Sequence, residues 1–113
     1  MEAAFIELPA FERHRECYLD DLAFLQLQCD LLSNPTGGDV IEGTGGLRKL
    51  RFGDRRRSKG KRGGLRIIYY YSMSESEFWL FDLYDKDEAV DWTPRQRARA
   101  KDLLKAELAK RLQ

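Results

Sequence analysis

Basic side chains are concentrated in one stretch of this 113-residue sequence. Residues 47–66 hold ten lysine or arginine residues and one acid, although the formal net charge of the whole chain is only +1. The segments on either side are acidic: residues 1–46 hold two bases and nine acids, and residues 67–91 hold one base and seven acids. A block of positive charge segregated in this way predicts a polyanionic partner.

The spacing of three of these cations places them on one surface. Lys49 and Arg51 alternate with apolar residues in a short strand-like segment, so their side chains point to the same face. Arg66 shares a face with Tyr70 in the next strand-like segment, and a tyrosine ring near cations can stack on an unpaired base. The pattern therefore predicts a phosphate-binding surface suited to single-stranded RNA, with salt-dependent affinity. The intervening loop adds the candidate binding residues Arg55, Arg56, Arg57, Lys59, Lys61 and Arg62.

The elements that position these residues can be read from the hydrophobic pattern. Apolar residues at spacings of three and four over residues 11–32 predict one helix, or two helices broken near Asp20 and Asp21. Thr93 and Gln96 form a capping box around Pro94, which predicts the start of a last helix. Alternating or β-branched runs predict strands at residues 3–8, 47–52, 65–71 and 78–84.

The predicted order is β-α-α-β-β-β-α, which indicates the α+β class. We expect one domain over residues 1–113, because this length supports a single hydrophobic core. The sheet is expected to have three or four mostly antiparallel strands, with the hairpin of residues 47–71 at its centre. Helices should pack on one face and leave a basic face open.

Several classes of protein are excluded by what the sequence lacks. No apolar run approaches the roughly 20 residues that a membrane span needs, and the N-terminal residues carry acids where a secretory signal needs bases. Cys17 and Cys29 are expected to be reduced thiols. Two separated cysteines and one histidine make no zinc ligand set. We therefore expect a cytoplasmic protein with no metal.

Three blocks of the sequence together carry a family resemblance. Residues 43–51 read GTGGLRKLR, residues 59–70 read KGKRGGLRIIYY, and residues 83–88 read LYDKDE. These blocks resemble the signature of the RelE superfamily of bacterial toxins, most closely its HigB-type branch. The resemblance extends from about Asp39 to the last helix, and it implies a RelE-like fold.

The resemblance also implies a function. RelE-like toxins are components of type II toxin–antitoxin systems, and they are ribosome-dependent endoribonucleases that cut mRNA without a metal or another cofactor. The implied partners are the ribosome, mRNA and a cognate antitoxin protein, which in this branch typically has a helix-turn-helix DNA-binding domain.

Such cleavage needs a base for the attacking 2′-hydroxyl, cations for the charged phosphorane and an acid for the departing 5′-oxygen. The only histidine, His14, lies on a predicted helix remote from the basic strands. By position, the resemblance implies that Arg66 contacts the scissile phosphate. Arg48 is a candidate RNA-binding residue, and it becomes a catalytic candidate in place of a neighbour if the register of its strand shifts by one. The residues implied as catalytic are Lys49, Arg51, Arg66, Tyr84 and Lys86.

Other interpretations stay open. The loop cations can be a solvated surface, the strand arginines can pair with acids of the flanking segments, and Tyr84 can be a packing residue. Asp87 stands where several relatives carry a basic or amide residue, and a carboxylate there would weaken phosphate binding or accept a proton. The alternative function is a non-catalytic nucleic-acid- or protein-binding module on the RelE-like fold, such as a degenerate toxin or a phage-derived inhibitor.

Overall fold

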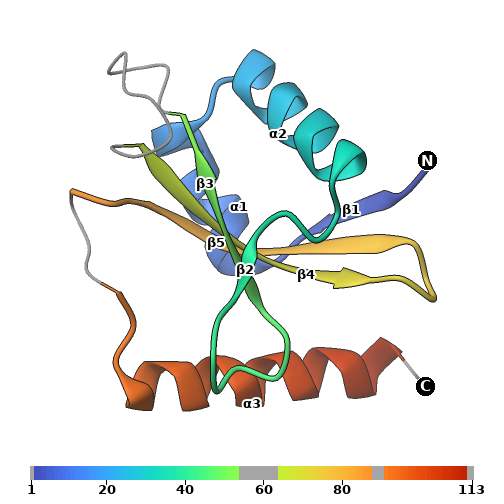
Figure 1. Cartoon of the computed structure of the whole chain (residues 1–113), viewed down its shortest axis with the longest axis vertical. Helices are drawn as coiled ribbons and strands as arrows, with labels where there is room; N and C mark the ends of the chain where they lie inside the picture. The colour runs from blue at the N-terminus through green and yellow to red at the C-terminus, as the bar shows by residue number, and fades with distance from the viewer. Residues whose placement is uncertain (1, 54–63, 88–90, 112–113) are drawn as a thin grey trace.

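The computed structural model describes residues 2–53, 64–87 and 91–111. The elements occur in the order β1 (Ala4–Glu7), α1 (Pro9–Tyr18), α2 (Asp21–Ser33), β2 (Asp39–Val40), β3 (Arg48–Phe52), β4 (Leu65–Ser72), β5 (Glu77–Asp85) and α3 (Pro94–Arg111). Figure 1 shows one sheet between the two N-terminal helices and α3. The predicted α+β class is confirmed. Among the described helices, none combines the length and the hydropathy that a membrane crossing requires.

The central strand of the sheet is β4, and the strand order is β1-β5-β4-β3-β2. β1 runs parallel to β5, whereas the other neighbours are antiparallel. Residues 65–69 of β4 are buried without alternation, because apolar side chains on both faces of this strand are covered. The prediction that the hairpin of β3 and β4 forms the centre is confirmed.

The described sheet has five strands rather than the expected three or four. The additional strand is β2, in which Asp39 pairs with Lys49 and Val40 pairs with Arg48. Both residues of β2 are exposed. A two-residue exposed strand has no apolar periodicity by which a sequence could reveal it.

α1 and α2 cover one face of the sheet (Figure 1). The chain breaks between them at Asp20, whose Oδ1 accepts a hydrogen bond from the backbone N–H of Ala23 at 2.7 Å. This contact caps α2 and satisfies a backbone donor that has no partner within the helix. The predicted break is therefore confirmed. The buried helical side chains on this face are Phe11, Ala23, Leu27 and Leu31.

α3 packs on the opposite face, so the expectation of one open face is wrong over this area. Ala100 and Leu104 of α3 are buried against Leu47, Ile68 and Trp79. These sheet residues are large and apolar, and burying them removes apolar surface from water. The part of this face that α3 leaves uncovered lies beside the first turns of the helix.

A β-bulge in β5 decides which face Tyr84 occupies. Ile68 pairs with Asp82 but Tyr69 pairs with Leu80, so β5 contains one extra residue at this point. Trp79 and Tyr84 are five positions apart and would lie on opposite faces of a regular strand. The bulge shifts the alternation, and both side chains pack in the cluster on the α3 face. Tyr84 is thereby placed on the same face as Lys49, Arg51 and Arg66.

Candidate active site

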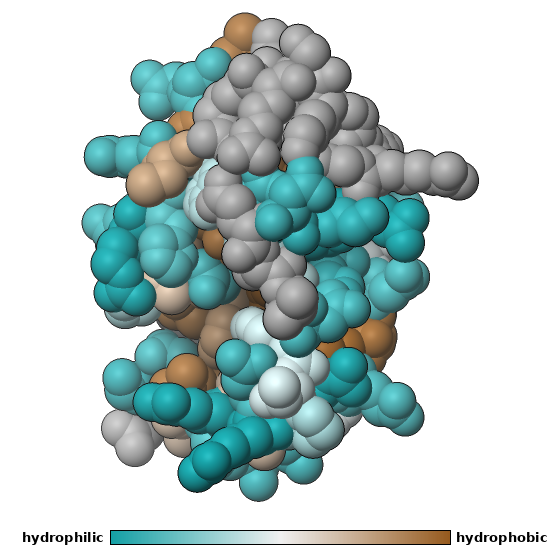
Figure 2. Space-filling view, turned by 90° about the vertical axis from the view of Figure 1, so that its left-hand side faces the viewer, coloured by the Kyte–Doolittle hydropathy of each residue, from teal (hydrophilic) through white to brown (hydrophobic). Residues whose placement is uncertain are grey.

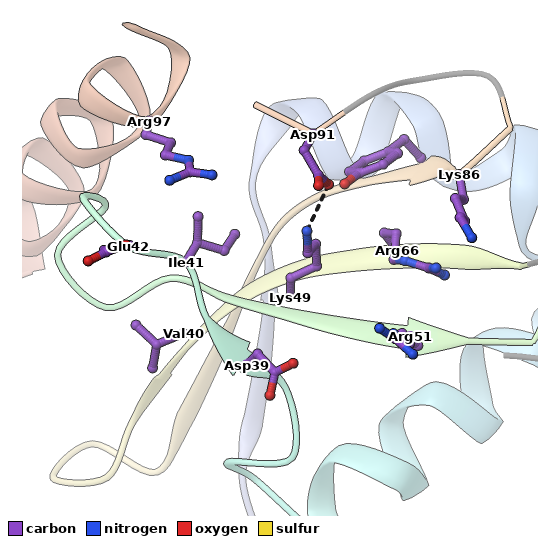
Figure 3. A pocket seen from close by; sticks show the side chains of 11 residues that line it. Asp39, Val40, Ile41, Glu42, Lys49, Arg51, Arg66, Lys86, Asp91 and Arg97 are labelled. Atoms are coloured by element: carbon purple, nitrogen blue, oxygen red, sulfur yellow. Dashed lines mark hydrogen bonds and ion pairs between the residues drawn. The ribbon is translucent and has the colours of Figure 1, made fainter. Parts of the chain in front are cut away.

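The open part of the α3 face contains a groove of about 880 Å³. It is bounded by the ends of β2 to β5, by the segment that follows β5, and by the first turns of α3 (Figure 3). Figure 2 shows mostly hydrophilic side chains on the side of the molecule where β5 ends and α3 begins. All five residues predicted to be catalytic line this groove: Lys49, Arg51, Arg66, Tyr84 and Lys86.

Three of these residues form a row across the sheet. Arg51 of β3 is the direct cross-strand partner of Arg66 of β4, and Arg66 is the direct partner of Tyr84 of β5. Directly opposed side chains have Cβ atoms about 4.5–5.5 Å apart, and like charges in such a pair are destabilising. The Arg51–Arg66 pair is therefore a place where an anion between the two guanidinium groups would relieve repulsion.

Arg66 is set into the sheet rather than extended into solvent. Arg66 as a whole is only 7% exposed. Its Nη1 donates a hydrogen bond to the carbonyl oxygen of Leu65 at 3.2 Å. Burial of part of a charged side chain fixes its position, since few rotamers remain available. The guanidinium is thus a preorganised donor on the floor of the groove.

Lys49 and Asp91 form an ion pair across the groove (Figure 3). Nζ of Lys49 donates to Oδ1 of Asp91 at 2.8 Å. The hydrogen bond from Lys49 and its charge hold the pKa of the Asp91 carboxyl below the ordinary value, and Arg97 and Arg66 act in the same direction. Asp91 is therefore ionised at neutral pH.

Tyr84 keeps its phenolic proton at neutral pH. Burial raises the pKa of the Tyr84 hydroxyl, and the negative charges of Asp91 and Asp82 add to this effect, whereas Arg66 opposes it. A protonated phenol at the edge of a cationic groove is suited to donate a proton to a departing oxygen.

Two solved structures have a similar architecture. The archaeal RelE–RelB complex from Pyrococcus horikoshii contains a chain that matches with a TM-score of 0.50 and 22% identity, over 79% of this chain and 100% of that chain. A mutant of the E. coli toxin RelE in the free state matches with a TM-score of 0.51 and 14% identity, over 87% of this chain and 95% of that chain. This chain has the RelE fold. At these sequence identities the likeness concerns the fold alone. No family model matches the sequence. Membership of the HigB-type branch therefore stays a prediction.

On this RelE fold, two predicted binding residues lie away from the groove. Nη1 of Arg48 donates to the carbonyl oxygen of Gly38 at 2.8 Å and to that of Thr36 at 3.3 Å. The ring of Tyr70 packs on Trp79, with 5.5 Å between the centroids. Arg48 is thus occupied by loop carbonyls, and Tyr70 belongs to the core under α3. The predicted loop residues Arg55, Arg56, Arg57, Lys59, Lys61 and Arg62 lie outside the described residues.

His14 lies on α1, on the opposite side of the sheet from the groove. Its Nδ1 is 2.8 Å from Oδ1 of Asp82, and its side chain is 42% exposed. This agrees with the prediction that His14 lies on a helix remote from the basic strands. Within the described ranges, no group of three or more His, Cys, Asp or Glu residues is arranged to hold a metal ion.

Sequence reasoning missed four charged residues of the groove: Asp39, Glu42, Asp91 and Arg97. Arg97 projects from α3 toward the groove (Figure 3), and its Nε is buried with no hydrogen-bond partner among the described residues. A signal for Arg97 was present, because it precedes the buried Ala100 by three positions and so shares its helix face. Asp91 had no such signal, since it lies between β5 and α3 and reaches Lys49 only in the folded chain.

Proposed function

We propose that this chain is the toxin of a type II toxin–antitoxin pair, and that it cuts ribosome-bound mRNA without a metal. The observation that carries the proposal is the cross-strand row of Arg51, Arg66 and Tyr84 beside Lys49, inside one groove on a RelE fold. Cations and a protonated phenol are two of the three kinds of group that metal-free RNA cleavage requires, the third being a base.

In the proposed mechanism, the scissile phosphate lies over Arg51 and Arg66. The 2′-oxygen of the preceding ribose attacks phosphorus while the bond to the 5′-oxygen breaks. Arg66 can hold two phosphate oxygens at once and stabilise the charge that develops on them. Tyr84 gives its proton to the departing 5′-oxygen. Lys86, which also lines the groove, is our candidate acceptor for the 2′-hydroxyl proton, which it takes up in its neutral amine form.

We further propose two macromolecular partners. The ribosome presents the mRNA and supplies the rest of the binding surface for the basic loop. A cognate antitoxin protein, with a helix-turn-helix DNA-binding domain, blocks the toxin, and the archaeal neighbour was solved in complex with RelB. A small reading frame for such a protein next to this gene would support the pairing.

The decisive experiment is induced expression in bacteria followed by primer extension on a test mRNA. We expect growth arrest with new 5′ ends inside codons of the translated region. Arg66→Ala should restore growth and remove these ends, whereas Arg13→Ala, an exposed α1 arginine on the other side of the sheet, should behave as the wild type. Growth arrest without new 5′ ends would instead support a non-catalytic binding module.

A further inference from the structure

Three acids, Asp39, Glu42 and Asp91, line the groove beside its cations. Asp91 comes from the segment between β5 and α3, and its carboxylate accepts the 2.8 Å hydrogen bond from Nζ of Lys49. The side chain of Lys49 is 31% exposed and that of Asp91 is 73% exposed. The pair therefore lies at the surface of the groove, where an incoming ligand meets it first.

The carboxylate of Asp91 occupies the kind of position that suits a phosphate oxygen. It is bound by Lys49 and lies within the electrostatic influence of Arg66 and Arg97. Carboxylate and phosphate oxygens accept the same charge-assisted hydrogen bonds from an ammonium group. An exposed ion pair is also weak, so a phosphate that reaches Lys49 can replace the carboxylate.

We propose that Asp91 is an internal counterion of the groove, which holds Lys49 in the free protein and is displaced from it by a phosphate group of the bound RNA. This inference rests on the proposed function, because it takes RNA as the occupant of the groove. Asp91 thus lowers the affinity for RNA and positions the ammonium of Lys49 before RNA arrives.

The test is a binding measurement with an RNA that the protein cannot cut. A short single-stranded 2′-O-methyl oligonucleotide lacks the attacking hydroxyl, and fluorescence anisotropy at low salt gives its Kd. Asp91→Asn should bind about three- to tenfold more tightly than the wild type, and the difference should shrink at high salt. Asp91→Glu keeps the charge and should bind close to the wild type.

The matched control is Asp102→Asn, which makes the same change of charge at an exposed α3 residue that does not line the groove. It should change the Kd less than Asp91→Asn does. The advantage of Asp91→Asn should also disappear in a Lys49→Ala background, because the competition is for Lys49. Equal effects of the two Asn variants, or unchanged binding with a fall in kcat, would overturn the counterion role.

Inorganic phosphate separates this inference from the proposed function. Its binding is followed by NMR shifts of groove residues in the wild type and in Asp91→Asn. If the oligonucleotide fails to bind, the wild type leaves ribosome-bound mRNA uncut and phosphate binds Asp91→Asn more tightly, the RNA-cutting function fails and the counterion role stands. If phosphate and oligonucleotide bind the two proteins equally, the counterion role fails and the proposed function is untouched.

Discussion

Arg51 and Arg66 face each other directly across β3 and β4, on the floor of the groove. Two guanidinium groups in this relation repel each other, which lowers the stability of the sheet. Four neighbouring residues of β4, Leu65, Ile67, Ile68 and Tyr69, are buried in the apolar clusters on the two faces of the sheet and stabilise the strand. A local cost of this kind is typical of a site that is completed by its ligand.

Replacing Arg66 tests the chemical step. Arg66→Ala should lower the single-turnover rate of mRNA cleavage on ribosomes by about 100- to 1,000-fold, the effect of removing one preorganised donor. Arg66→Lys should rescue little, because an ammonium cannot hold two phosphate oxygens in a fork. Lys49→Ala and Arg51→Ala should lower the cleavage rate less than Arg66→Ala does, because neighbouring cations substitute in part. A folded Arg66→Ala protein that cuts at the wild-type rate would contradict the mechanism.

Replacing Arg51 separates stability from binding. Arg51→Gln removes the like-charge pair and should stabilise the fold by about 0.2–1 kcal/mol, as measured by urea unfolding. The same variant should bind RNA more weakly, and its log–log salt slope should be smaller by about one, because one phosphate contact is lost. Lower stability together with unchanged RNA binding would show that Arg51 has a purely structural role.

Tyr84→Phe tests the proton donor while keeping the ring in the core. Cleavage should slow by about 100-fold or more, and RNA binding should stay near the wild-type value. The pKa of Tyr84 is raised above the ordinary tyrosine value of 10.0, so its hydroxyl should stay protonated up to higher pH. The wild-type cleavage rate should therefore not fall through loss of this proton until the pH exceeds 10.0. The pH–rate profile measures this, and an alkaline limb that is unchanged in Tyr84→Phe would exclude Tyr84 as the acid.

Stability at alkaline pH depends on Tyr69. Burial raises the pKa of Tyr69 above 10.0, and its hydroxyl donates to the carbonyl oxygen of Pro35 at 2.8 Å. The folded state holds this proton more tightly than the unfolded state, so the stabilisation is complete below pH 10 and is lost as pH rises through the folded pKa. Urea unfolding should show a decline above pH 10 that is smaller in Tyr69→Phe.

The contact of α3 with the sheet can be tested with two adjacent leucines. Leu104 is 1% exposed and Leu103 is 54% exposed. Leu104→Ala should lower the free energy of unfolding by about 2–5 kcal/mol, because it leaves a cavity against the sheet. Leu103→Ala should change it by less than about 0.5 kcal/mol. Similar values for both variants would mean that α3 does not pack as described.

The sequence by itself determined the local geometry of this protein. The two-residue period of a strand determined that Lys49 and Arg51 of β3 share one face, and that Arg66 of β4 lies on the face opposite Leu65, Ile67 and Tyr69. The capping box of α3 also follows from sequence, since Thr93 and Gln96 exchange hydrogen bonds at 2.8 and 3.2 Å. These features depend on residues a few positions apart, so local periodicity and side-chain chemistry are enough to predict them.

Only the tertiary structure decided how distant segments complete the groove. The bulge in β5 turns Tyr84 toward Arg66, and its position follows from packing on both faces of the sheet rather than from a local signal. α3 covers the face that sequence reasoning left open and brings Arg97 to the groove. Asp91 reaches Lys49 across 42 positions of the chain. Contacts at such separations depend on the path of the whole backbone, and no periodicity within one segment encodes them.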